Sequence, residues 1–331
     1  MATTAGTDFT TNLYTTIGKP FGRTASHVRE AIWGAVFVSP WILGLLVFTA
    51  GPVLASLYFG FTEFDILGTP KWVGLDNYAQ ALNLGQVIPA FSHLRVDRLV
   101  YRSMGNTLLY SGIIVPIGTV SSLLLAILLN QKLRGTYLFR TLFYIPQLIP
   151  AIASVMLWKF LMQPRVGLMN SIIQAVGLRP IGWLTDPSTA MMSVIMIGLW
   201  GSIGGNRMLI FLAGLQGVPT ELYEAADLDG AGAVSKFWNV TLPMISPTLL
   251  FNLILGVIGS LQVFTIAFAA TEGGPSYATW FFALHIYRQA FQYFRMGYGS
   301  ALAWIFAVVV LFFTWVQLQA SEKWVFYAGA S

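Results

Sequence analysis

Six long apolar segments constrain the fold of this chain more than any other feature of its sequence. Together they contain only two charged residues, Lys159 and Arg207. A helix needs about 20 apolar residues to cross a bilayer core of about 30 Å, and backbone groups in lipid must be satisfied internally. The runs also lack the alternation of membrane-barrel strands. The sequence therefore predicts an all-α membrane protein with six transmembrane helices, at about residues 31–60, 105–131, 141–162, 189–216, 246–271 and 297–320.

Composition agrees with a single membrane domain. Charged residues make up 9% of the chain, against about 25% in soluble proteins. We expect a polar cytosolic tail over residues 1–30 and one membrane domain over residues 31–331. The first apolar run is longer than the roughly 7–15 residues of a signal-peptide core, so we expect it to be retained. The absence of cysteine excludes disulfides, thiolate metal sites and a cysteine nucleophile.

The basic residues give a weak orientation signal. The net charge is +5, which we assign to lipid headgroups rather than to a nucleic acid. Eight Lys and Arg residues fall in the loops on each side of the six segments. The short stretch 131–140 packs three of them closely, and dense basic loops favour the cytosolic side. We therefore expect the N-terminus to face the cytosol.

Several modes of action are disfavoured by what the chain lacks. None of its six lysines precedes Ser or Thr, so there is no GxxxxGK[ST] phosphate loop, and we expect ATP and Mg²⁺ on a separate subunit. All thirteen Asp and Glu residues lie outside the six segments, which argues against proton or sodium coupling. The three histidines are far apart, and there is no HExxH or GxSxG motif. We predict no catalytic residue, no metal site and no cofactor in this chain.

Residues 217–245, called here the polar hairpin, form the one long polar stretch between two apolar segments. Glu221–Asp227 has a helical pattern after Pro219-Thr220. Gly230 and Gly232 allow a sharp turn, and a second helix begins near Val234. On residue types alone the hairpin is either a cytosolic connection with no role or the contact for a soluble partner.

The polar hairpin resembles the coupling loop of type I ABC importer permeases. The residues that match are Glu221, Glu224, Ala225, Ala226, Asp229, Gly230, Ala231, Leu242 and Pro243. Other stretches resemble the carbohydrate-uptake branch, and in particular the larger permease of maltose-type systems. These are Val73–Tyr78, Asn106-Thr107, Phe139-Arg140, Tyr144–Pro146, Phe211–Gln216 and Gly273–Pro275. The resemblance extends over about residues 31–327.

This resemblance implies a type I permease fold in a prokaryotic inner membrane, with the polar hairpin and both termini on the cytosolic side. Glu224 would seat in a groove of an ATPase, and Gly230 would permit the turn between two coupling helices. The implied partners are a second homologous permease, two ATPase subunits that bind ATP and Mg²⁺, and an extracytoplasmic solute-binding protein that delivers a sugar. Transport would proceed by rigid-body alternating access. Two alternatives stay open: the same machinery for glycerol phosphate, a polyol or a uronate oligosaccharide, and a stand-alone channel or secondary carrier.

Polar groups inside the fourth and fifth segments are the candidates for solute contact, because sugars need hydrogen-bonding groups beside apolar faces. The residues suggest Ser202, Asn206, Arg207, Ser260, Gln262, Thr265 and Phe264. The resemblance places Ser202, Asn206, Ser260, Val263 and Phe264 at sugar-contacting positions. The competing interpretation is that small polar residues hold helices together.

Arg207 is the one cation well inside its segment, where a centred Arg costs about 2.5–3.5 kcal/mol on insertion scales. Either it reaches an interface or a partner's carboxylate, or it binds an anionic solute such as a uronate oligosaccharide or a sugar phosphate.

Overall fold

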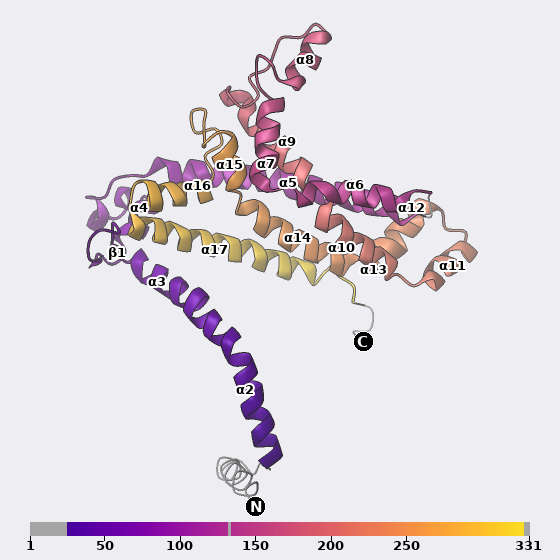
Figure 1. Ribbon diagram of the computed structural model, residues 1–331, viewed down its shortest axis with the longest axis horizontal. Coiled ribbons are helices and arrows are strands. Elements are labelled where there is room, and N and C mark those ends of the chain that lie inside the picture. Colours follow the sequence, from indigo (N-terminus) through magenta and orange to yellow (C-terminus); the bar gives the residue numbers. More distant parts are fainter. Residues whose placement is uncertain (1–24, 132–133, 328–331) are drawn as a thin grey trace, which may run out of the picture. The chain divides into compact units, whose positions relative to one another are not determined.

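The computed structural model describes residues 25–131 and 134–327 and divides into two units at Gly60 (Figure 1). The first unit contains α2 (Ala25–Leu45), a π-helical turn (Leu46–Ala50) and most of α3 (Gly51–Gly60). Most of the expected tail 1–30 lies outside the described residues. Residues 29–60 form one apolar helical stretch of 32 residues, with none of its most apolar window buried inside the chain. The first predicted span is thus helical throughout.

The second unit is a helical bundle around α5 (Arg98–Asn130). This helix packs against α9 (Pro187–Ser202), α10 (Gly205–Gln216) and α14 (Ser246–Leu261). Next to α14 lies α17 (Met296–Ser321), and α15 (Thr265–Ala270) packs against α7 (Ala151–Leu161). These helices form because their sequences are apolar and uncharged over most of their length, so their faces can meet lipid or one another.

Two of the predicted spans are each divided into two helices. α6 (Thr136–Leu148) and α7 meet at 95°, and α9 and α10 meet at 44°. Pro150 lacks an N–H and keeps the preceding Ile149 out of the helical region, which ends α6. At the second break Gly204 has a φ of 88°, a backbone conformation that favours glycine. The described chain thus contains four unbroken candidate spans, or six when each bent pair is one span.

The connections gather at two ends of the bundle. At one end lie β1 (Thr62–Glu63) and β2 (Lys71–Trp72), which pair antiparallel, then α4 (Asp76–Ala81) and two 3₁₀ turns (Leu84–Gln86 and Pro89–Phe91). That end also has α16 (Phe282–Tyr287) and a π-turn (Arg288–Gln292). α8 (Leu168–Ala175) lies in the connection between α7 and α9.

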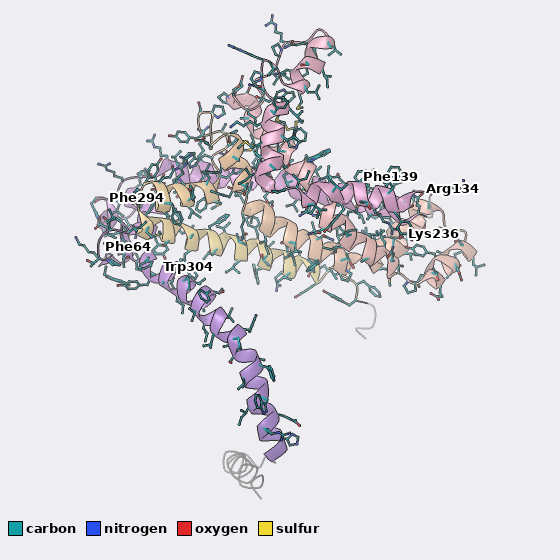
Figure 2. All side chains as sticks on the ribbon, in the orientation of Figure 1. Phe64, Arg134, Phe139, Lys236, Phe294 and Trp304 are labelled. Atoms are coloured by element: carbon teal, nitrogen blue, oxygen red, sulfur yellow. The ribbon has the colours of Figure 1, made fainter. Side chains whose placement is uncertain are left out.

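The opposite end carries the polar hairpin. It consists of α11 (Thr220–Leu228), α12 (Ala233–Lys236), a π-turn (Phe237–Thr241) and α13 (Leu242–Met244). Figure 2 shows Lys236 at this end and Phe64 and Phe294 at the other. The two helices predicted in the hairpin are present.

Small residues let the helices of the bundle approach closely. A Cβ on Gly198 of α9 would lie 2.2 Å from the hydroxyl of Tyr110 on α5. A Cβ on Gly214 of α10 would lie 2.7 Å from the hydroxyl of Thr248 on α14. Such small-residue contacts are the usual way in which membrane helices pack. They bring α5, α9, α10 and α14 together around the site described next.

Candidate transport pathway and polar hairpin

A cavity of about 590 Å³ lies where both divided spans break, and is called here the break cavity. Gln147 and Ala151 border it from the α6–α7 break, and Ser202 and Arg207 border it from the α9–α10 break. Further lining residues come from α5 and α14, among them Tyr110, Ile114, Leu255, Gly256, Gly259 and Ser260. Its volume lies within the range of about 300–1,000 Å³ typical of small-molecule sites. The cavity is therefore large enough for a sugar-sized solute.

The structure brings three of the eight predicted pathway residues to this cavity, namely Ser202, Arg207 and Ser260. The other five lie outside its lining: Asn206, Gln262, Val263, Phe264 and Thr265. Val263 is buried in an apolar cluster with Tyr110. The ring of Phe264 stacks on Phe268 at 5.4 Å between centroids.

Ser260 also joins two helices. Its hydroxyl lies 2.6 Å from that of Ser111, so the two form a hydrogen bond between α14 and α5. On the neighbouring helix pair, Ser122 donates to the backbone carbonyl of Ser202 at 3.0 Å. Helix pairing and cavity lining thus coexist at these serines.

Two glycines on neighbouring helices leave space for the guanidinium group of Arg207. A Cβ on Gly118 of α5 would lie 2.6 Å from Nη1 of Arg207, and a Cβ on Gly256 of α14 would lie 2.9 Å from Nη2. Nη1 is buried and has no hydrogen-bond partner within the described part of the chain. Among the ion pairs of the described residues, none includes Arg207. The guanidinium charge is therefore not neutralised by a carboxylate of this part of the chain.

The turn of the polar hairpin has the hydrogen bonds of a Schellman motif. The amide of Ala231 donates to the carbonyl of Ala226 at 2.8 Å, and the amide of Gly230 donates to that of Asp227 at 3.0 Å. Gly230 has a φ of 75° at the position that this motif requires. Asp229 lies at the end of α11 and is exposed. The predicted role of Gly230 in the turn has a direct geometric basis.

The two faces of α11 differ in exposure. Tyr223 and Ala226 are half-buried, whereas Glu221, Glu224 and Ala225 are exposed. Next to these exposed residues, Leu228 is 91% exposed. None of the ion pairs among the described residues involves Glu221 or Glu224. The outer face of α11 thus presents free carboxylates beside an apolar side chain, a combination suited to a protein partner.

The inner face of the polar hairpin packs against the bundle, where Tyr223, Phe237 and Val240 contact the apolar cluster of α5 and α10. Two further bonds join parts of the hairpin to each other. The hydroxyls of Tyr223 and Thr241 lie 3.0 Å apart, and Nζ of Lys236 donates to Asp227 at 2.6 Å. The latter ion pair is partly exposed and contributes about 0–1 kcal/mol. Beyond the turn, Leu242 and Pro243 are half-buried at the start of α13. A force applied to α11 would therefore reach the bundle through packed side chains.

Sequence reasoning missed Tyr110 and Gln147 as cavity-lining residues. Gln147 stands between Pro146 and Pro150, and two prolines so close together within an apolar segment signal a possible break. Tyr110 gives no such signal, since an aromatic residue in a span is most often part of the packing.

Comparisons with known proteins agree with this architecture. Residues 114–323 match the family model described as "Binding-protein-dependent transport system inner membrane component". The probable ABC transporter permease protein YesP of Bacillus subtilis is 35% identical over 92% of this chain and 95% of its own length. The trehalose/maltose transport system permease protein MalF of Thermococcus litoralis is 33% identical over 89% of this chain and 95% of its own.

Among solved structures, a bacterial ABC transporter involved in the import of the acidic polysaccharide alginate has a chain with a TM-score of 0.77. It is 23% identical and covers 90% of this chain and 98% of its own. That likeness confirms the predicted fold. By its sequence and by its architecture, the chain belongs to the family of binding-protein-dependent transport system inner membrane components.

Proposed function

We propose that this chain is the permease subunit of an ATP-driven importer and forms part of the pathway for a sugar or an oligosaccharide. The observation that carries the proposal is the outer face of α11, where Glu221, Glu224 and Leu228 are exposed on a hairpin packed against the bundle. Such a face suits a groove with basic and apolar residues on a soluble partner.

The proposed function implies three kinds of protein partner. Two ATPase subunits bind ATP and Mg²⁺, a second homologous permease completes the pathway, and a solute-binding protein delivers the substrate from outside. The chain itself is non-catalytic. ATP-driven closure of the ATPases moves α11, and the movement reaches the bundle through Tyr223, Phe237 and Val240, which pack against α5 and α10. The two divided spans border the break cavity, and discontinuous helices at a solute site are a recurring feature of transporters.

The proposed orientation places the polar hairpin and both termini in the cytosol. Near the hairpin end, the amide of Phe326 donates to Oγ of Ser246 at 2.8 Å, which holds the C-terminal segment against the start of α14. The basic stretch at 131–140 joins the same end of α5 to α6. Dense basic residues favour the cytosolic side, which supports this orientation.

The sugar class is supported by the lining of the break cavity and by relatives. The polar residues Tyr110, Ser154, Ser202, Ser260 and Gln147 border the cavity together with apolar residues. This mixture of polar groups and apolar faces suits a polyhydroxylated solute. Relatives are named for trehalose and maltose and for arabinooligosaccharides, and another for sn-glycerol 3-phosphate.

The proposal is tested by purifying the tagged chain from its native membrane in mild detergent and identifying what accompanies it by mass spectrometry. We expect an ATPase and a second permease. Glu224→Lys reverses a charge on the outer face of α11 and should release the ATPase while retaining the permease. The matched control is Glu63→Lys, an exposed carboxylate at the other end of the bundle, which should retain both. Isolation of the wild-type chain alone would contradict the proposal.

A further inference from the structure

Arg207 borders the break cavity with an unpaired charge. We propose that it is the anion-binding residue of this cavity, and that the solute carried is a sugar or polyol with a carboxylate or phosphate group. The inference rests on the proposed importer function and narrows its substrate class.

The first support is the depth of Arg207. Nine residues separate it from Gln216, the last residue of α10, and at about 1.5 Å per residue its Cα lies about 14 Å from that end of the helix. A side chain so far from the C-terminal end of α10, and already packed against α5 and α14, does not reach water at that end of the helix. Its charge is therefore satisfied within the bundle or in the cavity.

The second support is the missing partner. Nη1 is buried without a hydrogen bond, and no ion pair among residues 25–131 and 134–327 includes Arg207. An ionised group in a site of low dielectric attracts an opposite charge more strongly than it does in water. A guanidinium group offers a planar fork of donors that fits a carboxylate or a phosphate.

The third support is the way in which neighbouring helices leave room for the guanidinium group. The approach of Nη1 to Gly118 and of Nη2 to Gly256 is possible only because neither position has a side chain. The group thus has a defined place between α5 and α14, at the wall of the cavity. A positioned fork loses less conformational entropy on binding an anion than a mobile one does.

The surroundings add a further favourable field. Arg207 is in the first turn of α10, whose leading N–H groups have no partner within the helix. The positive end of a helix attracts anions, and half-helices in transporters point such ends at anionic substrate groups. The same wall holds Ser202, and Tyr110 and Ser260 border the cavity from other helices, so hydroxyl groups of the solute have partners close to the charge.

The size of the cavity favours a solute over a simple ion. At about 590 Å³ it exceeds by far the volume of about 30 Å³ that one water molecule occupies. A chloride ion would leave most of this space to water, whereas a sugar acid or a polyol phosphate fills more of it and also uses the hydroxyl groups.

The inference is tested on the assembled importer, purified through a tag on this chain and placed in lipid nanodiscs. Calorimetry measures the affinity for two matched pairs of probes, trigalacturonate with its methyl ester and sn-glycerol 3-phosphate with glycerol. We expect one anionic probe to bind at least about tenfold more tightly than its neutral counterpart, the size of one charge-assisted hydrogen bond. Which pair shows the difference distinguishes a carboxylated from a phosphorylated solute.

Arg207→Gln should abolish that difference, and co-purification of the second permease and the ATPase shows that the variant is folded. Arg207→Lys keeps the charge without the fork and should retain part of the preference. Arg165→Gln removes an exposed charge outside the six spans and should leave the preference intact.

Three results would overturn the inference: equal affinities for each pair, a preference that survives Arg207→Gln, or no binding of either anion by an intact complex. Equal affinities are also the result expected if a carboxylate of the second permease neutralises Arg207. Co-purification of the ATPase is read from the same samples. Its absence contradicts the importer function, whereas its presence with equal affinities contradicts only the role of Arg207.

Discussion

Nε2 of His285 lies 3.1 Å from Oδ2 of Asp97, although 188 residues separate them in the chain. The Nδ1 atom of the same ring accepts from the indole N–H of Trp280 at 3.1 Å. An indole N–H can only donate, so Nδ1 is unprotonated and Nε2 donates to Asp97. Tyr298 donates to the same carboxylate at 2.9 Å. The network joins the start of α5, where Asp97 is the cap, to α16 and α17.

Replacing His285 should destabilise the bundle. The side chain is fully buried, and His285→Ala leaves Asp97 and the indole of Trp280 without one partner each. Two such losses in a buried network cost about 2–4 kcal/mol. Thermal unfolding of the purified chain should show a clear drop in Tm. His93→Ala is the control, since His93 is largely exposed and 3.6 Å from Asp76, and an effect as large as that of His285→Ala would argue against this account.

We expect the carboxylate of Asp97 to make the stability of the fold sensitive to acid. Burial acts to raise the pKa of the Asp97 carboxyl, but the hydrogen bonds from His285, Tyr298 and the Leu99 amide hold it below its usual value. Because the folded pKa is depressed, the stabilisation is complete above the unfolded pKa of about 3.9 and is lost as pH falls through the lower folded value. Unfolding measured between pH 6 and pH 3 should show a steeper loss for the wild type than for Asp97→Asn. Equal slopes would mean that Asp97 contributes nothing to acid sensitivity.

Two glycines in the turn of the polar hairpin have equally open surroundings but different backbone conformations. Gly230 has a φ of 75° and Gly232 a φ of −72°, and an added Cβ would contact nothing at either position. Gly230→Ala should therefore cost about 1–2 kcal/mol through the left-handed conformation alone, and Gly232→Ala should cost little. We expect the first variant to retain less ATPase in detergent and to transport more slowly, while the second behaves as wild type. If the two variants behave alike, the left-handed conformation of Gly230 is not what the turn requires.

The place of the Arg207 guanidinium can be tested from the neighbouring helix. Gly118→Ala would put a Cβ 2.6 Å from Nη1 and 2.8 Å from Oγ of Ser202, whereas Gly112→Ala on the same helix meets nothing within 4 Å. The first change should displace Arg207 and lower solute uptake in proteoliposomes by tenfold or so, about 1.4 kcal/mol. The second change should leave uptake within about twofold of the wild-type value, since an alanine fits a helix at least as well as a glycine. Equal uptake by both variants would show that the position of Arg207 does not matter.

The apolar segments were sufficient to predict the helical spans, but not the breaks within them. Pro116 lies inside the unbroken α5, whereas Pro150 accompanies a 95° bend. Whether a proline breaks a span depends on whether neighbouring groups satisfy the freed backbone atoms, and those neighbours come from distant parts of the chain. The sequence therefore indicates where a break can occur but not whether it does.

The candidate pathway could be predicted only in part, because contacts from distant parts of the chain also decide which residues border it. An in-span charge is costly wherever it lies, so Arg207 was identified from the sequence alone. Val263 and Phe264 fall in the short gap between α14 and α15, where the helix ends at Leu261. There Val263 packs in the apolar cluster with Tyr110 and Phe264 stacks on Phe268, outside the lining of the break cavity. A gap-free helical interpretation of the sequence could not anticipate these contacts.

The most direct test of the central claim is a site-specific photo-cross-link from the polar hairpin. The chain has no cysteine, so a thiol-reactive benzophenone attaches to it only at an introduced position. Glu224→Cys on the outer face of α11 should cross-link to the ATPase in native membranes, and Glu63→Cys at the opposite end should not. A cross-link from Glu63→Cys to the ATPase, or none from Glu224→Cys, would contradict the claim that the polar hairpin receives the force that drives transport.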